Sequence, residues 1–461
     1  MKNWTLILCP AIAIGIGIMV FRCGGSAEMA WTAAVTLLVA SWWILEPIPI
    51  PATSLIPLAV FPLVGVLDQQ QVAAAYGDSL ILLMLGGFLL SGAMERSGAH
   101  RRIALGMVNL CGASSGRRLV LGFMAASALL SMWISNAATT LMLLPIAMAI
   151  VAQTKNAKLQ ISLLLGIAFA ASIGGIGTPI GTPPNVVFMA LIAVDERGEI
   201  GFLQWMMWSI PIVLLMLPIA GFWLTRGLGS IEPIELPKMG AWRSEEIRTL
   251  IVFGITALLW VTRTQPWGGW SAVLQSAGMP IKGYVNDSTV ALLGAIALFV
   301  LPNGKGERLL NWESASKVPW GVLILFAGGL CISIALKSSG LSEQLGLTLS
   351  GLGALPTLLL IFAVCLAATF LTEVTSNTAT AALLLPILAT AASAAEIDPR
   401  LLMVPATISA SFAFMLSVAT PPNAIVFGSG RLSVNRMARE GFVLNLVGIV
   451  IVTAVTYLML R

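Results

Sequence analysis

Charged side chains are scarce in this chain. Only 10% of its 461 residues are Asp, Glu, Lys or Arg, against roughly a quarter in an ordinary soluble domain. There are five cysteines without a Cys-x-x-Cys pair, which argues against a disulfide framework or a cysteine zinc site. No basic segment is interleaved with aromatic residues, so the sequence predicts no nucleic-acid binding.

Apolar residues are abundant instead, at 58% of the chain, with a mean hydropathy of +0.94. A helix of about 20 such residues crosses the hydrocarbon core of a bilayer. The first apolar segment follows a lysine, but it is longer than a signal-peptide core and lacks a clear cleavage site, so we count it as a span. Eleven spans are predicted, at 4–21, 29–45, 53–67, 79–95, 160–195, 203–224, 248–262, 289–301, 320–336, 400–428 and 442–459. The predicted class is an all-α polytopic membrane protein.

Two more apolar stretches, 119–152 and 357–394, are too long for one span. Each carries a Ser-Asn pair near its middle, Ser135-Asn136 in the first and Ser376-Asn377 in the second. Non-helical backbone at membrane depth is tolerated only inside protein or beside water. We therefore predict two re-entrant hairpins whose tips lie inside the protein.

The chain is internally duplicated. Between the 13-residue segments that start at Ser135 and Ser376, 8 of 13 positions are identical. Gly86-Gly87 matches Gly328-Gly329 at an offset of 242, and the Thr-Pro-Pro-Asn motif at 182–185 matches 420–423 at an offset of 238. One unit of span, hairpin and broken span thus occurs twice.

The duplication sets the predicted domain boundaries. The first repeat covers 1–226, with its hairpin at 119–152 and its broken helix at 160–195. A polar cytoplasmic linker covers 227–247. The second repeat covers 248–461, with its hairpin at 357–394 and its broken helix at 400–428.

Lysine and arginine predict the orientation. With the N-terminus in the cytoplasm, 18 of 25 basic residues fall in cytoplasmic segments, as the positive-inside rule requires. We therefore predict a multi-pass plasma (inner) membrane protein with a cytoplasmic N-terminus and an external C-terminus. The first hairpin then enters from the cytoplasm and the second from outside. Inverted repeats of this kind are typical of secondary transporters that work by alternating access.

Each broken span predicts free backbone carbonyls. Glycine and proline crowd the segment 174–185, and proline removes a backbone donor, so no continuous helix survives there. One such break is often only a kink, but two at matching positions favour a binding site. Carbonyls, hydroxyls and amides are hard ligands that suit Na⁺. The candidate ligands are Ser131, Ser135 and Asn136 in the first copy, and Thr372, Thr375, Asn377 and the carbonyls around Ala419 in the second.

Both hairpin tips place Ser and Asn just before a helical run. Helix capping alone explains either pair singly. The helix N-terminus that follows also carries partial positive charge and free N–H groups, so two facing tips suit a substrate with two negative groups. No Lys, Arg or His lies near these motifs, and the sole histidine, His100, falls in a predicted loop. Glu373 is the one acidic residue in a hairpin. Because its counterpart is Met132, we favour a structural hydrogen-bonding role over proton or cation binding.

These paired motifs, each followed by Thr-Pro-Pro-Asn, resemble the divalent anion:sodium symporter family over nearly the full chain. That family includes carriers of succinate, malate, fumarate, citrate or sulfate. The resemblance implies a homodimer whose protomers have a scaffold domain and an elevator-like transport domain. It implies one sodium site at Ser131, Ser135, Asn136 and Gly181, and another at Thr372, Thr375, Asn377 and Ala419. It implies substrate contacts at Asn136, Asn377, Thr378, Thr420 and Pro421, to which we add the tip serines Ser135 and Ser376.

One position departs from the family pattern. Ala137 stands where the first motif usually has Thr, so a substrate hydroxyl contact is missing unless water or Ser135 replaces it. The leading expectation is sodium-coupled symport of a divalent anion, with a C4-dicarboxylate such as succinate as the first candidate. A sodium-independent dicarboxylate or citrate exchanger of the same fold is the alternative, although the hydroxyls of Ser131 and Thr372 count against it. A membrane-embedded enzyme ranks far lower, because neither a His-Glu-x-x-His motif nor a pair of intramembrane aspartates is present.

Overall fold

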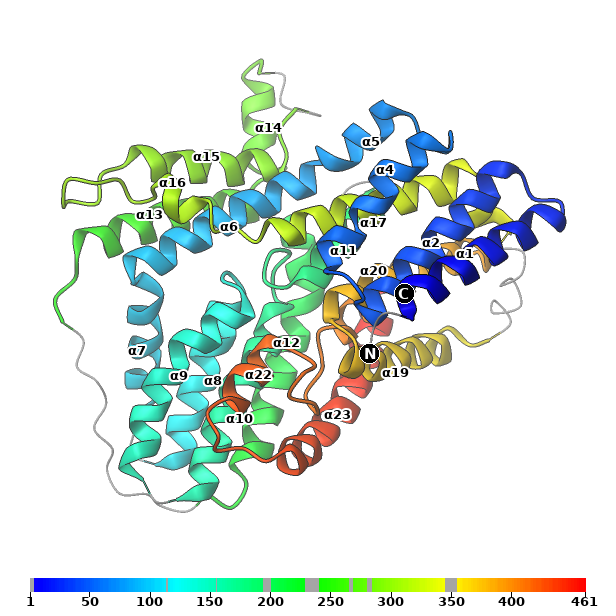
Figure 1. The fold of residues 1–461 in the computed structure, drawn as a ribbon. Helices are drawn as coiled ribbons and strands as arrows, with labels where there is room; N and C mark the ends of the chain where they lie inside the picture. The colour runs from blue at the N-terminus through cyan, green and yellow to red at the C-terminus, as the bar shows by residue number, and fades with distance from the viewer. Residues whose placement is uncertain are drawn as a thin grey trace.

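The computed structural model describes residues 4–112, 115–154, 156–193, 200–228, 240–264, 268–279, 284–344 and 355–461. Every regular element among them is a helix, so the predicted all-α class is confirmed (Figure 1). The first repeat contributes α1 Thr5–Arg22, α2 Ala27–Leu45, α3 Ile50–Thr53, α4 Leu55–Leu63, α5 Gln69–Tyr76, α6 Ser79–Ser97, α7 Ala99–Cys111, α8 Gly116–Ser131, α9 Asn136–Gln153, α10 Ala157–Gly175, α11 Pro183–Ala193 and α12 Phe202–Thr225. The second contributes α13 Ser244–Val261, α14 Gly269–Ser276, α15 Asp287–Val300, α16 Trp312–Ala315, α17 Trp320–Ser338, α19 Thr357–Val374, α20 Asn377–Ala394, α21 Arg400–Ser409, α22 Pro421–Phe427 and α23 Val434–Leu460.

Helix length alone does not reproduce the predicted number of spans. In the described ranges, nine helices are long and apolar enough to cross a membrane, and two of the nine, α9 and α19, are single arms of the predicted hairpins. The predicted spans at 53–67, 248–262, 289–301 and 400–428 are not among the nine. The count of eleven therefore stays a prediction, as does the linker at 227–247, of which residues 229–239 lie outside the described residues.

The two long apolar stretches fold as pairs of helices. In the first, α8 ends at Ser131 and α9 begins at Asn136; in the second, α19 ends at Val374 and α20 begins at Asn377. Serine caps the second helix of each pair, since Ser135 Oγ accepts from the Ala138 N–H at 3.2 Å and Ser376 Oγ from the Ala379 N–H at 3.1 Å. These bonds satisfy donors that a helix start leaves free, so the Ser-Asn pairs mark the tips of helical hairpins.

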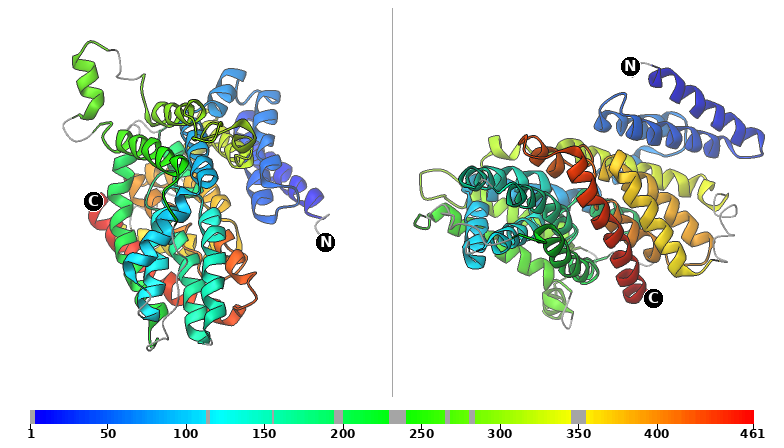
Figure 2. Two further views of the ribbon diagram at one scale, coloured as in Figure 1. Left: turned by 90° about the vertical axis from the view of Figure 1, so that its left-hand side faces the viewer. Right: turned by 90° about the horizontal axis from the view of Figure 1, so that it is seen from below.

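The helices form two groups, and each repeat contributes to both. The first group contains α1–α6, α13 and α15–α17, and the second contains α7–α12 and α19–α23. Figure 1 shows the first group across the upper part of the molecule and α8–α10, α22 and α23 in the lower part. Seen from below in Figure 2, α23 runs between helices of the first repeat and the yellow and gold helices α19 and α20. The second group holds both hairpins and both breaks.

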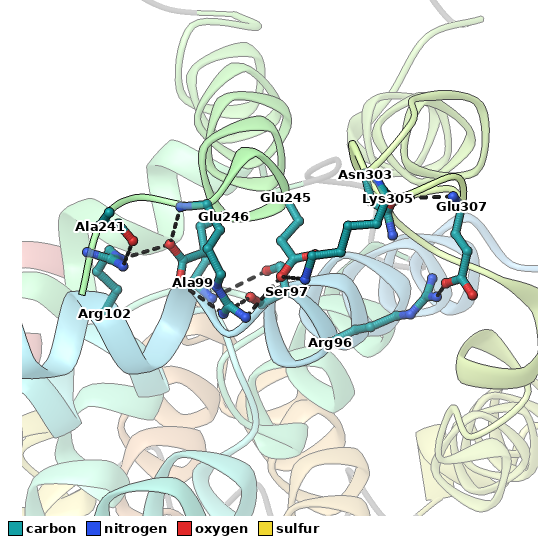
Figure 3. A network of polar contacts seen from close by, with 11 residues as sticks. Arg96, Ser97, Ala99, Arg102, Ala241, Glu245, Glu246, Asn303, Lys305 and Glu307 are labelled. Atoms are coloured by element: carbon teal, nitrogen blue, oxygen red, sulfur yellow. Dashed lines mark hydrogen bonds and ion pairs between the residues drawn. The ribbon is translucent and has the colours of Figure 1, made fainter. Parts of the chain in front are cut away.

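A polar network ties the corner between α6 and α7 to the start of α13 (Figure 3). Glu246 accepts from Arg102 and from Arg243 at 2.9 Å each, and Arg243 also donates to the Ser97 carbonyl at 2.8 Å. Burial raises the pKa of Glu246, but hydrogen bonds from Arg243 and Arg102 outweigh it and hold that pKa below its ordinary value. Further ion pairs in the same view join Arg96 with Glu307 and Lys305 with Glu245. The network fixes the point where the chain passes from the first helix group to the second.

Candidate functional site

Oxygen atoms converge on the tip of the first hairpin. The hydroxyl of Ser131 lies 2.5 Å from the side-chain amide of Asn136, and the same end of that amide lies 3.3 Å from the carbonyl oxygens of Ala171 and Gly181. Ser131 is fully buried and Asn136 half-buried. The tip and the break of the first repeat therefore meet at one point.

The Asn136 amide can satisfy these neighbours in two ways. With its nitrogen toward them, it donates to both carbonyls and to Ser131 Oγ. With its oxygen toward them, Asn136 accepts from the Ser131 hydroxyl and faces the two carbonyl oxygens, an arrangement that a cation between these oxygens would stabilise. Hard cations hold oxygen ligands at about 2.3–2.6 Å, so ligands at right angles lie roughly 3.3–3.7 Å apart. The two 3.3 Å separations from the carbonyl oxygens fit that spacing, whereas the 2.5 Å between Ser131 Oγ and the Asn136 amide is a hydrogen-bond distance.

Gly181 is a position where only glycine fits. A Cβ built there would lie 2.4 Å from the Gly175 carbonyl oxygen and 3.0 Å from those of Ser131 and Met132. Such contacts with backbone atoms cannot be relieved by side-chain movement. The absence of a side chain thus lets three carbonyls approach the break. Ser135, which was also predicted as a sodium ligand, uses its hydroxyl to cap α9.

The second hairpin repeats the first arrangement. Thr372 Oγ1 donates to Asn377 Oδ1 at 2.8 Å and lies 2.9 Å from the Ala410 carbonyl oxygen. Thr375 turns back onto its own hairpin, where its hydroxyl lies 2.9 Å from the Leu371 carbonyl and 2.6 Å from Thr380 Oγ1. The structure therefore pairs Thr372 with Asn377 as it pairs Ser131 with Asn136, whereas Thr375 is bonded elsewhere.

Two buried asparagines that the sequence reading left without a role hold the breaks in shape. Asn185 donates through Nδ2 to the carbonyls of Thr178 at 2.8 Å and Gly175 at 3.2 Å. Asn423 donates in the same way to Ala413 at 2.9 Å and Leu416 at 3.0 Å. These bonds satisfy carbonyls that lack helical partners. The signal in the sequence was the repeated Asn at the end of each Thr-Pro-Pro-Asn motif.

Glu373 ties the second tip to the second break. Its carboxylate accepts from the backbone N–H groups of Met415 and Leu416 at 2.9 Å each, and from Asn445 Nδ2 at 2.7 Å. It is only 3% exposed. These three donors satisfy the buried carboxylate, which acts as a hydrogen-bond acceptor. At the matching place in the first repeat, the Thr178 hydroxyl instead donates to the Met132 carbonyl.

The predicted substrate residues lie around these tips. Asn377, Thr378 and Ser376 are half-buried, and Pro421 is exposed. Thr420 is buried, and its hydroxyl caps α22 by accepting from the Asn423 N–H at 3.2 Å. Because α9 packs against α22 and α20 against α11, each hairpin contacts the broken helix of the other repeat. The two oxygen clusters and two helix N-termini therefore belong to one unit of the fold.

Comparison with known proteins identifies the family. The model of the sodium:sulfate symporter transmembrane region matches residues 1–460. The chain belongs to the sodium:sulfate symporter family. The resemblance to divalent anion:sodium symporters is thereby confirmed, and this multi-pass membrane protein belongs among transporters rather than enzymes.

Relatives within the sodium:sulfate symporter family are similar over most of their length. A sodium-dependent dicarboxylate transporter of Staphylococcus saprophyticus is 38% identical, covering 98% of this chain and 90% of the relative. The transporter of the same name from Staphylococcus aureus is 40% identical, covering 93% and 86%.

Solved structures share the fold at low sequence identity. The YdaH transporter of Alcanivorax borkumensis aligns with a TM-score of 0.62 at 14% identity, covering 87% of each chain. MtrF of Neisseria gonorrhoeae aligns with a TM-score of 0.58 at 14% identity, covering 87% of this chain and 84% of that one. These likenesses concern the fold alone.

Proposed function

We propose that this protein is a sodium-coupled symporter of a divalent carboxylate anion. The observation that carries the proposal is the repeated pairing of a hydroxyl with an Asn amide at each hairpin tip, Ser131 with Asn136 and Thr372 with Asn377. Carbonyl oxygens of the breaks stand beside both pairs. The relatives named sodium-dependent dicarboxylate transporters support the same conclusion.

We assign separate chemistry to the cation and the anion. One Na⁺ would bind Ser131, Asn136 and the Gly181 carbonyl, and a second Thr372, Asn377 and the Ala419 carbonyl; Ser135 and Thr375 remain proposed ligands. The dicarboxylate would take the N-termini of α9 and α20, with Asn136, Asn377, Thr378, Thr420 and Pro421 around it. Since no cationic side chain offsets the anion at the tip motifs, bound sodium supplies that charge, and each ligand raises the affinity for the other.

Succinate is the first substrate to test, because the relatives are named dicarboxylate transporters and two helix N-termini suit two carboxylates. Ala137 removes a hydroxyl from the first tip, whereas Thr378 keeps one at the second. The first carboxylate would thus rely on the Asn136 amide and backbone N–H groups. This asymmetry bears on affinity among dicarboxylates more than on sodium coupling.

The proposal extends to assembly and orientation. The first helix group would be a scaffold and the second a transport domain that moves past it, in a homodimer. The repeats at 1–226 and 248–461 would have opposite topology on either side of the 227–247 linker. The N-terminus would be cytoplasmic and the C-terminus external in the plasma membrane, as the positions of lysine and arginine favour.

Uptake of radiolabelled succinate into proteoliposomes tests the function. We expect uptake with an inward Na⁺ gradient and none when K⁺ replaces Na⁺. Uptake that ignores Na⁺ but requires internal dicarboxylate would favour the exchanger instead. If neither condition supports uptake, citrate and sulfate are the next anions to test, and the C4-dicarboxylate assignment is wrong.

A further inference from the structure

A pair of adjacent glycines occurs at matching places in α6 and α17. The first glycine of each pair packs inside the first helix group: a Cβ on Gly86 would lie 2.5 Å from Ala291 Cβ, and a Cβ on Gly328 would lie 2.5 Å from the Ser54 carbonyl oxygen. The first contact joins α6 to α15, and the second joins α17 to the start of α4. The first glycines therefore hold the first helix group together in both halves.

The second glycines differ. Gly87 faces Ile180 in the break of the first repeat, whose side chain lies 3.4 to 3.6 Å from a Cβ built on Gly87. Gly329 has no atom within 4 Å of such a Cβ. It borders an apolar crevice between α17, α11 and α20. The residue that corresponds to Ile180 is Val418, and it is 81% exposed.

The apolar residues at the two hairpin tips also differ in exposure. Trp133 at the first tip stacks on Phe202 at a centroid distance of 5.9 Å and meets Phe253 of α13 edge-on at 5.3 Å. Its counterpart at the second tip, Val374, is 71% exposed. Both apolar groups of the first repeat are thus packed on neighbouring helices, and both of the second repeat are exposed.

We propose that Ile180 on Gly87 and Val418 on Gly329 are alternative contacts that the protein exchanges as it moves. The structure shows the state in which the first contact is made. Because the repeats are inverted, the same interactions with their roles exchanged describe a state of opposite access. In that state Val418 packs over Gly329 while Ile180 becomes exposed. The inference rests on the proposed function for its alternating access.

The exposed hairpin tip also indicates which side of the membrane the described state opens to. The second hairpin enters from outside in the predicted orientation, and its tip is the exposed one. The structure is then outward-open, and sealing the outer side requires Val418 to bury its side chain. Exposing a valine or isoleucine side chain to water costs free energy. Burial of Val418 in one state and of Ile180 in the other therefore stabilises each state in turn.

The test uses aqueous labelling of single cysteines. In a background with all five natural cysteines replaced, V418C and I180C are each exposed to a hydrophilic maleimide in detergent-solubilised protein, where the reagent reaches both faces. Gly329→Phe fills the open space at Gly329 and blocks the Val418 contact. We expect it to raise V418C labelling and to lower I180C labelling several-fold. Gly87→Phe displaces Ile180, and we expect the reverse pair of changes.

Gly92→Phe is the matched control, because Gly92 also lies on α6 and a Cβ there would meet nothing within 4 Å. It should leave both labelling rates unchanged. Variants are compared only where gel filtration gives the same monodisperse peak. If a bulky variant does not fold, Ile180→Ala and Val418→Ala test the exchange instead, with the first expected to lower V418C labelling and the second to lower I180C labelling.

Three results would overturn the proposal: parallel changes in both cysteines, no change in either, or a V418C that no aqueous reagent reaches. None of these readings needs succinate or Na⁺, so the outcome separates from that of the uptake assay. Reciprocal labelling without sodium-dependent uptake would support the alternative contacts and contradict sodium-coupled succinate transport. Sodium-dependent uptake without reciprocal labelling would support the transport function and contradict the alternative contacts.

Discussion

Removing the Glu373 carboxylate should loosen the second break. Glu373→Ala leaves the Met415 and Leu416 N–H groups and the Asn445 amide without their acceptor. A buried donor that loses its partner costs about 1–3 kcal/mol, so with three such donors this variant should lose roughly 3–9 kcal/mol of unfolding free energy. Glu373→Gln keeps one oxygen acceptor but turns an amide nitrogen toward another donor, which should cost about 1–3 kcal/mol.

Thermal unfolding in detergent, followed by tryptophan fluorescence, measures the order of stability. We expect wild type to be most stable, then Glu373→Gln, then Glu373→Ala. Glu307→Gln is the control, because Glu307 is a surface partner of Arg96 and such pairs contribute about 0–1 kcal/mol. If Glu373→Ala unfolds at the same temperature as Glu307→Gln, the carboxylate does not hold the break and the structural role is wrong.

Three further predictions concern the site and the polar network. Asn136→Ala and Asn377→Ala should each abolish uptake while gel filtration shows a folded protein, and normal uptake by either would remove that tip from the site. Ala137→Thr should lower the half-saturating concentration for succinate by supplying a hydroxyl; an unchanged value means that this position does not contact substrate. The depressed pKa of Glu246 contributes stability that is present above the ordinary glutamate pKa and is lost as pH falls through the lower folded-state pKa. Glu246→Gln should therefore flatten the acid side of the stability profile, and an unchanged profile would show that the pairs with Arg102 and Arg243 contribute nothing.

Local chemistry made the hairpins and breaks predictable. Serine before an apolar helical run caps a helix, and proline is favoured in the first turn of one, so the positions of Ser135, Ser376 and Pro421 follow from neighbours in the chain. The duplication then showed which positions correspond. A hydroxyl and an Asn amide expected together at the first tip, Ser131 and Asn136, could therefore also be expected together at the second, as Thr372 and Asn377.

Contacts between distant segments were not predictable. Nothing near Glu373 points to Asn445, which comes from α23 and meets it only after folding. The buried bonds of Asn185 and Asn423 needed the actual path of each break. The number of spans stayed open because several helices, such as α15 Asp287–Val300, are shorter than about 20 residues and depend on packing rather than length.

Equilibrium binding tests most directly whether sodium and dicarboxylate share one site. Titration calorimetry would measure succinate affinity in Na⁺ and in K⁺, and sodium affinity with and without succinate. If both bind at the hairpin tips as proposed, Na⁺ raises succinate affinity and succinate raises Na⁺ affinity by the same factor, since linkage is reciprocal. Thr372→Ala and Ser131→Ala should reduce that factor. Succinate affinity that is equal in Na⁺ and K⁺ would contradict coupling at this site.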